Sequence, residues 1–176
     1  MRTERLQLRR WTDDDRAPFA ALNADPEVMR FFAGTMTRAE SDALADRIER
    51  HFDEHGYGLW AVSVVGGDPF IGFVGLLWQH LDAPWAPAVE IGWRLARSAW
   101  GKGYATEAAI AARDHAFGPA GLTDLVSMTT VTNLPSQAVM QRIGMTRDPA
   151  DDFLHPKLSP GHPLAPHVLY RLARPA

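Results

Sequence analysis

The sequence predicts an α+β fold, also describable as mixed α/β, in which strands and helices share one domain. Two observations support this prediction. Segments with the two-residue alternation of strands are interspersed with segments that have the longer period of helices. Their order is a strand, helices, adjoining strands, a strand–helix–strand–helix unit and a final strand, which fits a mixed architecture. The length of 176 residues suits one domain, so we expect residues 1–176 to form a single unit.

Composition narrows the class of protein. Hydrophobic residues make up 46% of the chain and cysteine is absent, which excludes disulfides, thiolate metal ligands and a cysteine nucleophile. No apolar run is long enough to cross a bilayer, and the charged start Met1–Arg5 lacks the apolar centre of a signal peptide. The net charge of -3 gives no reason to expect nucleic acid as a partner. We therefore expect a cytoplasmic protein with no membrane partner.

Six segments have the apolar alternation or the short apolar runs of strands. A hairpin turn is predicted at Gly66–Pro69, between the second and the third of them. A polar, proline-rich stretch from Arg147 to Pro166 precedes the last one. The predicted strands are 6–11, 59–65, 70–78, 89–95, 125–131 and 168–172.

Capping residues mark the starts of several predicted helices. Thr12–Asp15 offers N-capping oxygens ahead of a first helix. Asp25-Pro26 places a cap before a proline at a first helical position, which predicts a second helix. Thr37 and Glu40 form a capping box ahead of a third, which Gly56 ends. The predicted helices span 15–22, begin at 26, and span 38–55, 104–117 and 135–143.

The stretch Glu90–Thr106 is the most informative part of the sequence. A strand ends, the chain turns through Gly101-Lys102-Gly103, and a helix begins, so backbone N–H groups converge at the positive end of the helix dipole. The glycines let a phosphate group approach this backbone closely. The turn alone leaves phosphate binding and plain helix capping equally open. It fits neither a P-loop nor a dinucleotide fingerprint, because Ala96, Gly103 and Thr106 stand where those motifs need other residues.

Two blocks of residues resemble a known family. Trp100–Ala108 (WGKGYATEA) is similar to the acyl-CoA signature of the GNAT acetyltransferases, especially to the branch that contains the ribosomal-protein N-terminal acetyltransferases. Thr132–Ser136, followed by Gly144-Met145, resembles the second block of the family at the expected spacing. The opening Thr3–Arg9 and the Asp25-Pro26 pair are similar to the same branch. The resemblance therefore covers nearly the whole chain.

The resemblance implies a mostly antiparallel sheet that splays open beside Glu90–Leu95, with acetyl-CoA as co-substrate lying in the opening. The pantetheine arm would pair with an exposed strand edge, and the pyrophosphate would rest on the amides of the glycine turn. The acceptor would be an amine, either a small molecule or a protein N-terminus, and we expect a monomer or homodimer. The residues implied to bind the cofactor are Trp93, Arg94, Leu95, Gly101, Lys102, Gly103, Tyr104, Ala105, Thr106 and Asn133.

Two residues are candidates for proton transfer. Glu90 lies just upstream of the cofactor edge, where burial raises a carboxyl pKa toward the working range of a general base. Such a base suits an α-amine, because deprotonating a lysine at pH 7 costs about 3 kcal/mol more. Many relatives carry a tyrosine as the acid seven residues after the asparagine, but this chain has Met140 there. Ser136, at the start of the same helix, is the acid that we expect instead.

Other interpretations of these residues stay open. Glu90 also fits a sheet-edge acid, or an acid satisfied by an arginine, and Ser136 also fits an N-cap. Ser98 departs from the family pattern, which has Gln or Arg there. Because Met140 replaces the expected tyrosine, a non-catalytic acyl-CoA-binding domain is one alternative. A small nucleotide-binding module that uses the same glycine turn is another.

Two segments outside the motifs have expected roles. Trp85, in a proline-bearing loop, is the tryptophan that we expect to line an acceptor pocket. The spacing of His155, His162 and His167 matches no common zinc pattern, so we expect no metal. We expect this C-terminal stretch to fold over the acceptor side and to shape specificity.

Overall fold

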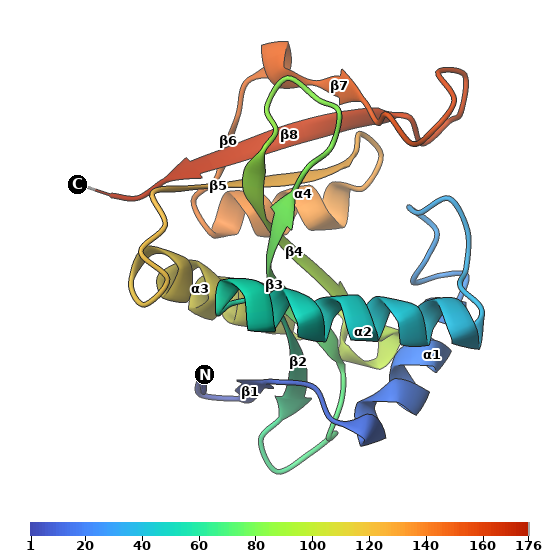
Figure 1. Ribbon diagram of the computed structural model, residues 1–176, viewed down its shortest axis with the longest axis vertical. Coiled ribbons are helices and arrows are strands. Elements are labelled where there is room, and N and C mark those ends of the chain that lie inside the picture. Colours follow the sequence, from blue (N-terminus) through green and yellow to red (C-terminus); the bar gives the residue numbers. More distant parts are fainter. Residues whose placement is uncertain (176) are drawn as a thin grey trace.

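A single eight-stranded sheet organises the protein in a computed structural model that describes residues 1–175. The strand order is β1-β2-β3-β4-β5-β8-β6, with β7 paired to β8 (Figure 1). Neighbouring strands are antiparallel except β4 and β5, which run parallel, so the predicted mixed fold with a mostly antiparallel sheet is confirmed. The strands are β1 (Leu6–Arg9), β2 (Leu59–Val64), β3 (Gly72–Gln79), β4 (Ala88–Leu95), β5 (Asp124–Thr130), β6 (Thr146–Arg147), β7 (Phe153–Leu154) and β8 (Pro166–Ala173).

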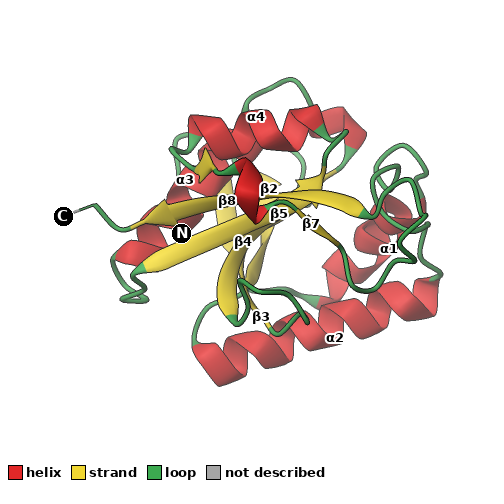
Figure 2. Ribbon diagram, turned by 90° about the horizontal axis from the view of Figure 1, so that it is seen from above, coloured by secondary structure: helices red, strands yellow, loops and turns green. Residues whose placement is uncertain are grey.

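Helices cover both faces of the sheet. Figure 2 shows α1 and α2 on one side and α3 and α4 on the other. Within residues 1–175, no helix has the length and apolar content that crossing a bilayer requires. The helices are α1 (Arg16–Ala24), α2 (Arg38–His55), α3 (Tyr104–Phe117) and α4 (Leu134–Arg142), with short 3-10 turns η1 (Asp13–Asp15), η2 (Arg97–Ala99) and η3 (Pro149–Asp151).

Local capping explains where the longest helix begins. The Thr37 hydroxyl accepts from the N–H of Glu40 at 3.3 Å, and the Glu40 carboxylate accepts from the N–H of Thr37 at 2.7 Å. This reciprocal pair satisfies two backbone donors that no helical carbonyl can reach. The helix α2 ends at Gly56, which adopts a left-handed conformation. The capping box and its glycine stop are therefore confirmed.

The helix predicted to begin at Pro26 is wrong, because residues 26–33 form turns and bends. The Asp25 carboxylate does accept from the N–H of Glu27 at 2.8 Å, so the local cap forms. Backbone hydrogen bonds then close only isolated turns, such as Met29 N–H to the Asp25 carbonyl at 3.0 Å. Val28 and Met29 are buried, but Arg30 and Phe32 beyond them are exposed, and helix nucleation is costly without a packed face.

The splay of the sheet lies between β4 and β5. These two strands share one register pair, Glu90 with Val126, although β4 continues to Leu95. On its other edge β4 stays paired with β3 along its whole length. The backbone groups of Trp93 and Leu95 therefore face an opening where a strand neighbour is missing, whereas the carbonyl of Arg94 is directed at β3, so the expected backbone contact of Arg94 with the cofactor is wrong. The predicted splay beside Glu90–Leu95 is confirmed.

The first residue of β3 fixes how closely β3 and β4 approach. Gly72 has a φ of 129°, and a Cβ added there would overlap the carbonyl oxygen of Arg94 and lie 2.8 Å from the Cα of Leu95. L side chains rarely adopt this backbone conformation, and no flexible side chain is available to move aside.

We predict that Gly72→Ala lowers the free energy of unfolding by about 2–5 kcal/mol, since it combines backbone strain with overpacking. Urea unfolding followed by circular dichroism measures this change. Gly34→Ala is the matched control, because a Cβ at Gly34 meets nothing within 4 Å. Equal stability of the two variants would contradict the packing argument.

Candidate active site

The opening between β4 and β5 leads into a cleft of about 1460 Å³. The structure brings nearly all the predicted site residues together along its walls. Glu90, Ser136 and Asn133 line the cleft, together with Trp93–Leu95 and the glycine turn. Lys102 is the exception, because its exposed side chain is not part of the lining.

The glycine turn has the geometry of an anion site. Gly101 and Gly103 have φ angles of 73° and 80°, and Gly103 is the N-cap of α3. The N–H groups of Tyr104, Ala105 and Thr106 belong to the first helical turn, where no preceding carbonyl is available to pair with them. A Cβ at Gly101 would meet no protein atom within 4 Å, so this face of the turn is open to a ligand. The helix dipole adds attraction for negative charge.

A cluster that sequence reasoning missed ties the N-terminal strand to this turn. Glu107, on α3, accepts from the Thr3 hydroxyl at 2.5 Å and from Arg5 Nε at 2.7 Å. Arg5 Nη1 also donates to the carbonyl of Lys102 at 3.0 Å, and its guanidinium lies 4.9 Å from the ring centre of Tyr104. Burial raises the pKa of Glu107, but hydrogen bonds from Thr3 and Arg5 outweigh burial and hold it below its usual range. The family motifs contained these residues without indicating that they pair.

Glu90 is held on β4 at the mouth of the splay. Its carboxylate accepts a hydrogen bond from the side chain of Gln79 on β3. No lysine, arginine or histidine of the described chain forms an ion pair with it, so the interpretation as an arginine-satisfied acid is wrong. Burial raises the pKa of Glu90 from 4.5 to about 7, and the hydrogen bond from Gln79 only partly opposes this rise.

Asn133 and Ser136 form a hydrogen-bonded corner at the start of α4. Asn133 is the N-cap and accepts from the N–H of Ser136 at 3.4 Å, so Ser136 itself is not the capping residue. The Ser136 hydroxyl oxygen accepts from Asn133 Nδ2 at 3.1 Å and from Trp93 Nε1 at 3.3 Å. Because both contacts use the oxygen as acceptor, the hydroxyl proton is available to a third group. Met140, where many relatives have tyrosine, is buried and cannot supply a proton.

Side chains of β4 alternate between the two helical layers. Trp93 points toward α4, whereas Arg94 points toward α1 and donates from Nη1 to the side-chain oxygen of Asn23 at 2.5 Å. The Arg94 guanidinium lies over the ring of Phe32 at 4.2 Å and over that of Phe73 at 5.4 Å. Burial lowers the pKa of Arg94 to about 10, which still leaves it charged at pH 7.

The expectations for Trp85 and for the C-terminal histidines have different outcomes. Trp85 packs edge-on against Phe153 at 5.5 Å in a small core cluster and does not line the cleft, so its expected role is wrong. Its loop folds back onto β5 and β8, a contact that no local pattern reveals. His155 and His167 do line the cleft, with ring centres 4.9 Å apart. Burial lowers the pKa of both, which favours neutral rings. Residues 1–175 bring together no trio of histidine and acidic side chains suited to a metal.

This combination of splayed strands and an anion-binding turn defines a class of acyltransferase, and comparison with known families agrees. A family model described as the acetyltransferase (GNAT) domain matches residues 5–146. The chain therefore belongs to the GNAT acetyltransferases, and it is an enzyme of the acetyl-CoA-dependent acyltransferase class. A nucleotide-binding module does not agree with that membership.

Three similar proteins extend this finding. YkkB of Bacillus subtilis is 31% identical over 144 residues, which cover 81% of this chain and 83% of YkkB. An acetyltransferase of Agrobacterium tumefaciens has a crystal structure with a TM-score of 0.80 and 29% identity, covering 99% of this chain and 94% of that one. RimL, described as a ribosomal L7/L12 α-N-protein acetyltransferase in complex with coenzyme A, shares the fold at 16% identity with a TM-score of 0.76, covering 97% and 95%.

The raised pKa of Glu90 has a consequence for stability. Between pH 4.5 and about 7 the folded protein holds this proton more tightly than the unfolded chain, so raising the pH through that window removes stability. Glu90→Gln abolishes this titration while keeping the shape of the side chain.

We predict that Glu90→Gln raises the free energy of unfolding at pH 8 by up to about 3 kcal/mol, and changes it by less than about 0.5 kcal/mol at pH 4.5. Chemical denaturation at the two pH values measures the difference. Glu54→Gln, at an exposed carboxylate on α2, controls for the loss of one charge. A gain of equal size at both pH values would argue against a carboxyl with a raised pKa.

Proposed function

We propose that the protein moves an acetyl group from acetyl-CoA directly to a primary amine, either of a small molecule or of a protein N-terminus. The observation that carries this proposal is the position of Glu90. A carboxyl with a pKa of about 7 lies at the point where β4 and β5 separate, in the same cleft as the glycine turn. Membership of the GNAT family supports the transfer, and the name of RimL supports an α-amine as one class of acceptor.

The open face of Gly101 supports binding of the cofactor at the glycine turn. A diphosphate accepts from several N–H groups at once, and no protein atom lies within 4 Å of a Cβ placed at Gly101, where the turn opens. In this proposal Trp93 and Leu95 pair through their backbone with the pantetheine amides, and Asn133 contacts the same arm; Arg94 has no backbone role, because its carbonyl is directed at β3. The bound acetyl-CoA supplies an activated thioester carbonyl.

Glu90 and Ser136 have complementary roles in this proposal. The ionised Glu90 removes a proton from the acceptor ammonium, directly or through a water, so that the neutral nitrogen attacks the thioester carbon. A new C–N bond forms as the C–S bond breaks, and the nitrogen releases its second proton, which restores the Ser136 hydroxyl through solvent. Ser136 donates its hydroxyl hydrogen toward the departing sulfur, a role supported by the two N–H groups that already occupy its oxygen.

The reaction can be tested by following thiol release from acetyl-CoA in the presence of peptides, amino acids and polyamines. Mass spectrometry of the same mixtures identifies the acetylated amine. We expect release only when an acceptor is present, in equal amount to the acetylated product. Tight binding of acetyl-CoA without release from any member of the panel would contradict the proposed function.

We predict that Glu90→Gln lowers kcat by about 100-fold or more, within the usual contribution of a general base, and changes the Kd for acetyl-CoA less than about threefold. The wild-type rate should rise with pH through about 7, because only ionised Glu90 accepts a proton. Stopped-flow turnover and calorimetric binding separate the two quantities. Parallel losses of turnover and of cofactor affinity would remove Glu90 from the role of base.

We predict that Gly101→Val weakens binding of acetyl-CoA by at least about 10-fold, because a branched side chain occupies the space where the phosphates approach. Equilibrium binding measures the effect. Thermal melting of the free variant reports the backbone strain at a φ of 73° separately. Gly161→Val, in the tail outside the cleft lining, is the matched control. Unchanged affinity in Gly101→Val would contradict the assignment of the phosphate site.

A further inference from the structure

One face of β4 presents two charged side chains separated by an open floor. Glu90, Gly92 and Arg94 lie on the same face, because side chains alternate along a strand. Gly92 contributes no side chain, and a Cβ placed there would meet nothing closer than the Glu90 carboxylate oxygen at 3.8 Å. All three residues line the cleft. The floor between the carboxylate and the guanidinium is therefore free for part of a ligand.

Arg94 is held rigidly but is not satisfied. Its Nη1 donates to Asn23, whose own amide donates to the Ser41 hydroxyl at 2.9 Å, and both of these partners are fully buried. This is the one hydrogen bond that the Arg94 guanidinium makes within residues 1–175, and its Nε is buried without a partner. An arginine donor left without an acceptor in such a position is costly, so the residue is poised for an acceptor from outside the chain.

Two carboxylates near the cleft are already paired with other arginines, so they do not provide an acceptor for Arg94. Arg5 pairs with Glu107 at 2.6 Å, and Arg30 pairs with Glu27 at 3.6 Å. Arg94 forms an ion pair with no carboxylate of the described chain, Glu90 included. Asn23 is a neutral acceptor, so apart from the ring faces of Phe32 and Phe73 the guanidinium meets no group that balances its charge. The missing counterion is therefore an anionic group of a ligand.

That anion belongs to the acceptor rather than to the cofactor. The Arg94 side chain lies on the α1 side of the sheet, under Phe32 and against Asn23. The phosphate turn caps α3, and the Ser136 corner belongs to α4, both on the opposite side. The Arg94 side chain and the phosphate turn are therefore directed toward opposite helical layers.

Resting on the proposed function, we infer that the acceptor is a small amino carboxylate with an apolar body, bound with its amine at Glu90 and its carboxylate at Arg94. A guanidinium fork matches a carboxylate in shape and charge. The walls on this side are apolar, and they suit an aliphatic or aromatic side chain. They include Val28, Phe32, Leu44, Leu59, Phe73 and Leu77. A polyamine would instead place a second cation against Arg94, which disfavours it.

Matched acceptors test this inference in the thiol-release assay. Leucine, leucinamide and 3-methylbutylamine share one apolar body and one amine, but only leucine carries a carboxylate; phenylalanine, its amide and phenethylamine repeat the series. We expect kcat/KM to be about 10- to 100-fold higher for the amino acids, the usual worth of a charge-assisted pair. The amide has the more easily deprotonated amine, so this preference cannot come from basicity.

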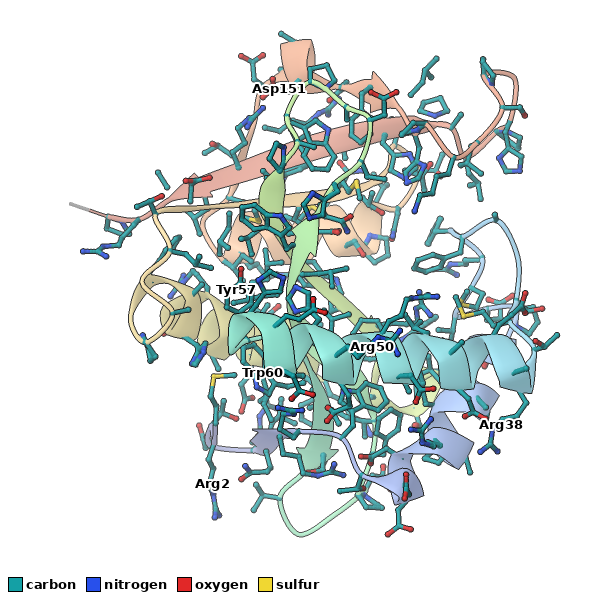
Figure 3. The ribbon with its side chains drawn as sticks, viewed as in Figure 1. Arg2, Arg38, Arg50, Tyr57, Trp60 and Asp151 are labelled. Atoms are coloured by element: carbon teal, nitrogen blue, oxygen red, sulfur yellow. The ribbon has the colours of Figure 1, made fainter. Side chains whose placement is uncertain are left out.

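Variants of Arg94 connect the preference to this residue. Arg94→Met should lower the ratio of kcat/KM for leucine to kcat/KM for leucinamide by about 10- to 100-fold. Arg94→Lys should keep part of the preference, because it retains the charge but not the fork. The matched control is Arg50→Gln on the exposed surface of α2, outside the cleft lining, which should behave as wild type (Figure 3). Circular dichroism and thermal melting show whether Arg94→Met is folded.

The outcomes separate this inference from the proposed function. Turnover that favours amides, polyamines or peptides over amino acids would overturn the acceptor class while leaving the transferase intact. Equal losses for leucine and leucinamide in Arg94→Met would also overturn it, because Arg94 would then act on folding or on the cofactor. Absence of thiol release with every amine would contradict the proposed function itself.

Discussion

The parting of two parallel strands after one register pair shapes everything else in this molecule. Past Glu90 and Val126, the edge of β4 has no strand neighbour, so its backbone groups need a partner from elsewhere. Elsewhere in a sheet such an edge would be covered or paired. Here the uncovered edge borders the cleft. An extended ligand can lie along this edge in the position that a neighbouring strand would otherwise occupy. The helix N-terminus of α3 stands at the end of that place and attracts negative charge.

β4 forms the floor of this opening, and its side chains alternate between the two faces of the sheet. The groups proposed to act in the reaction are therefore divided between those faces. Trp93 reaches toward α4 and supports the Ser136 corner, whereas Glu90 and Arg94 face the helices of the opposite layer. The reaction centre thus sits where two half-sites meet across one strand. The backbone alternates as well, since the carbonyl of Arg94 is directed at β3 while its side chain belongs to the acceptor side.

Sequence reasoning succeeded where the signal was local. The capping box of Thr37 and the helix at 104–117 depend on neighbours in the chain, and both were found with close boundaries. The turns after Pro26 were missed because a cap starts a helix that only packing can continue. Arg5 and Glu107 pair over a separation of 102 residues, and Trp85 packs onto β5 and β8, so their positions follow from topology alone. The raised pKa of Glu90 was expected, but the hydrogen bond that Gln79 donates to it was not foreseen.

The hydrogen bonds from Arg5 to Glu107 and to the Lys102 carbonyl connect the start of the chain to the cofactor turn. Anything that orders the first turn of α3 also favours the docked position of the opening segment, and by linkage the reverse holds with equal free energy. Amide exchange along β1 should therefore slow when coenzyme A is added, although β1 lies at the far edge of the sheet. The earliest residues of the chain would then act as a remote sensor of whether the cleft is filled.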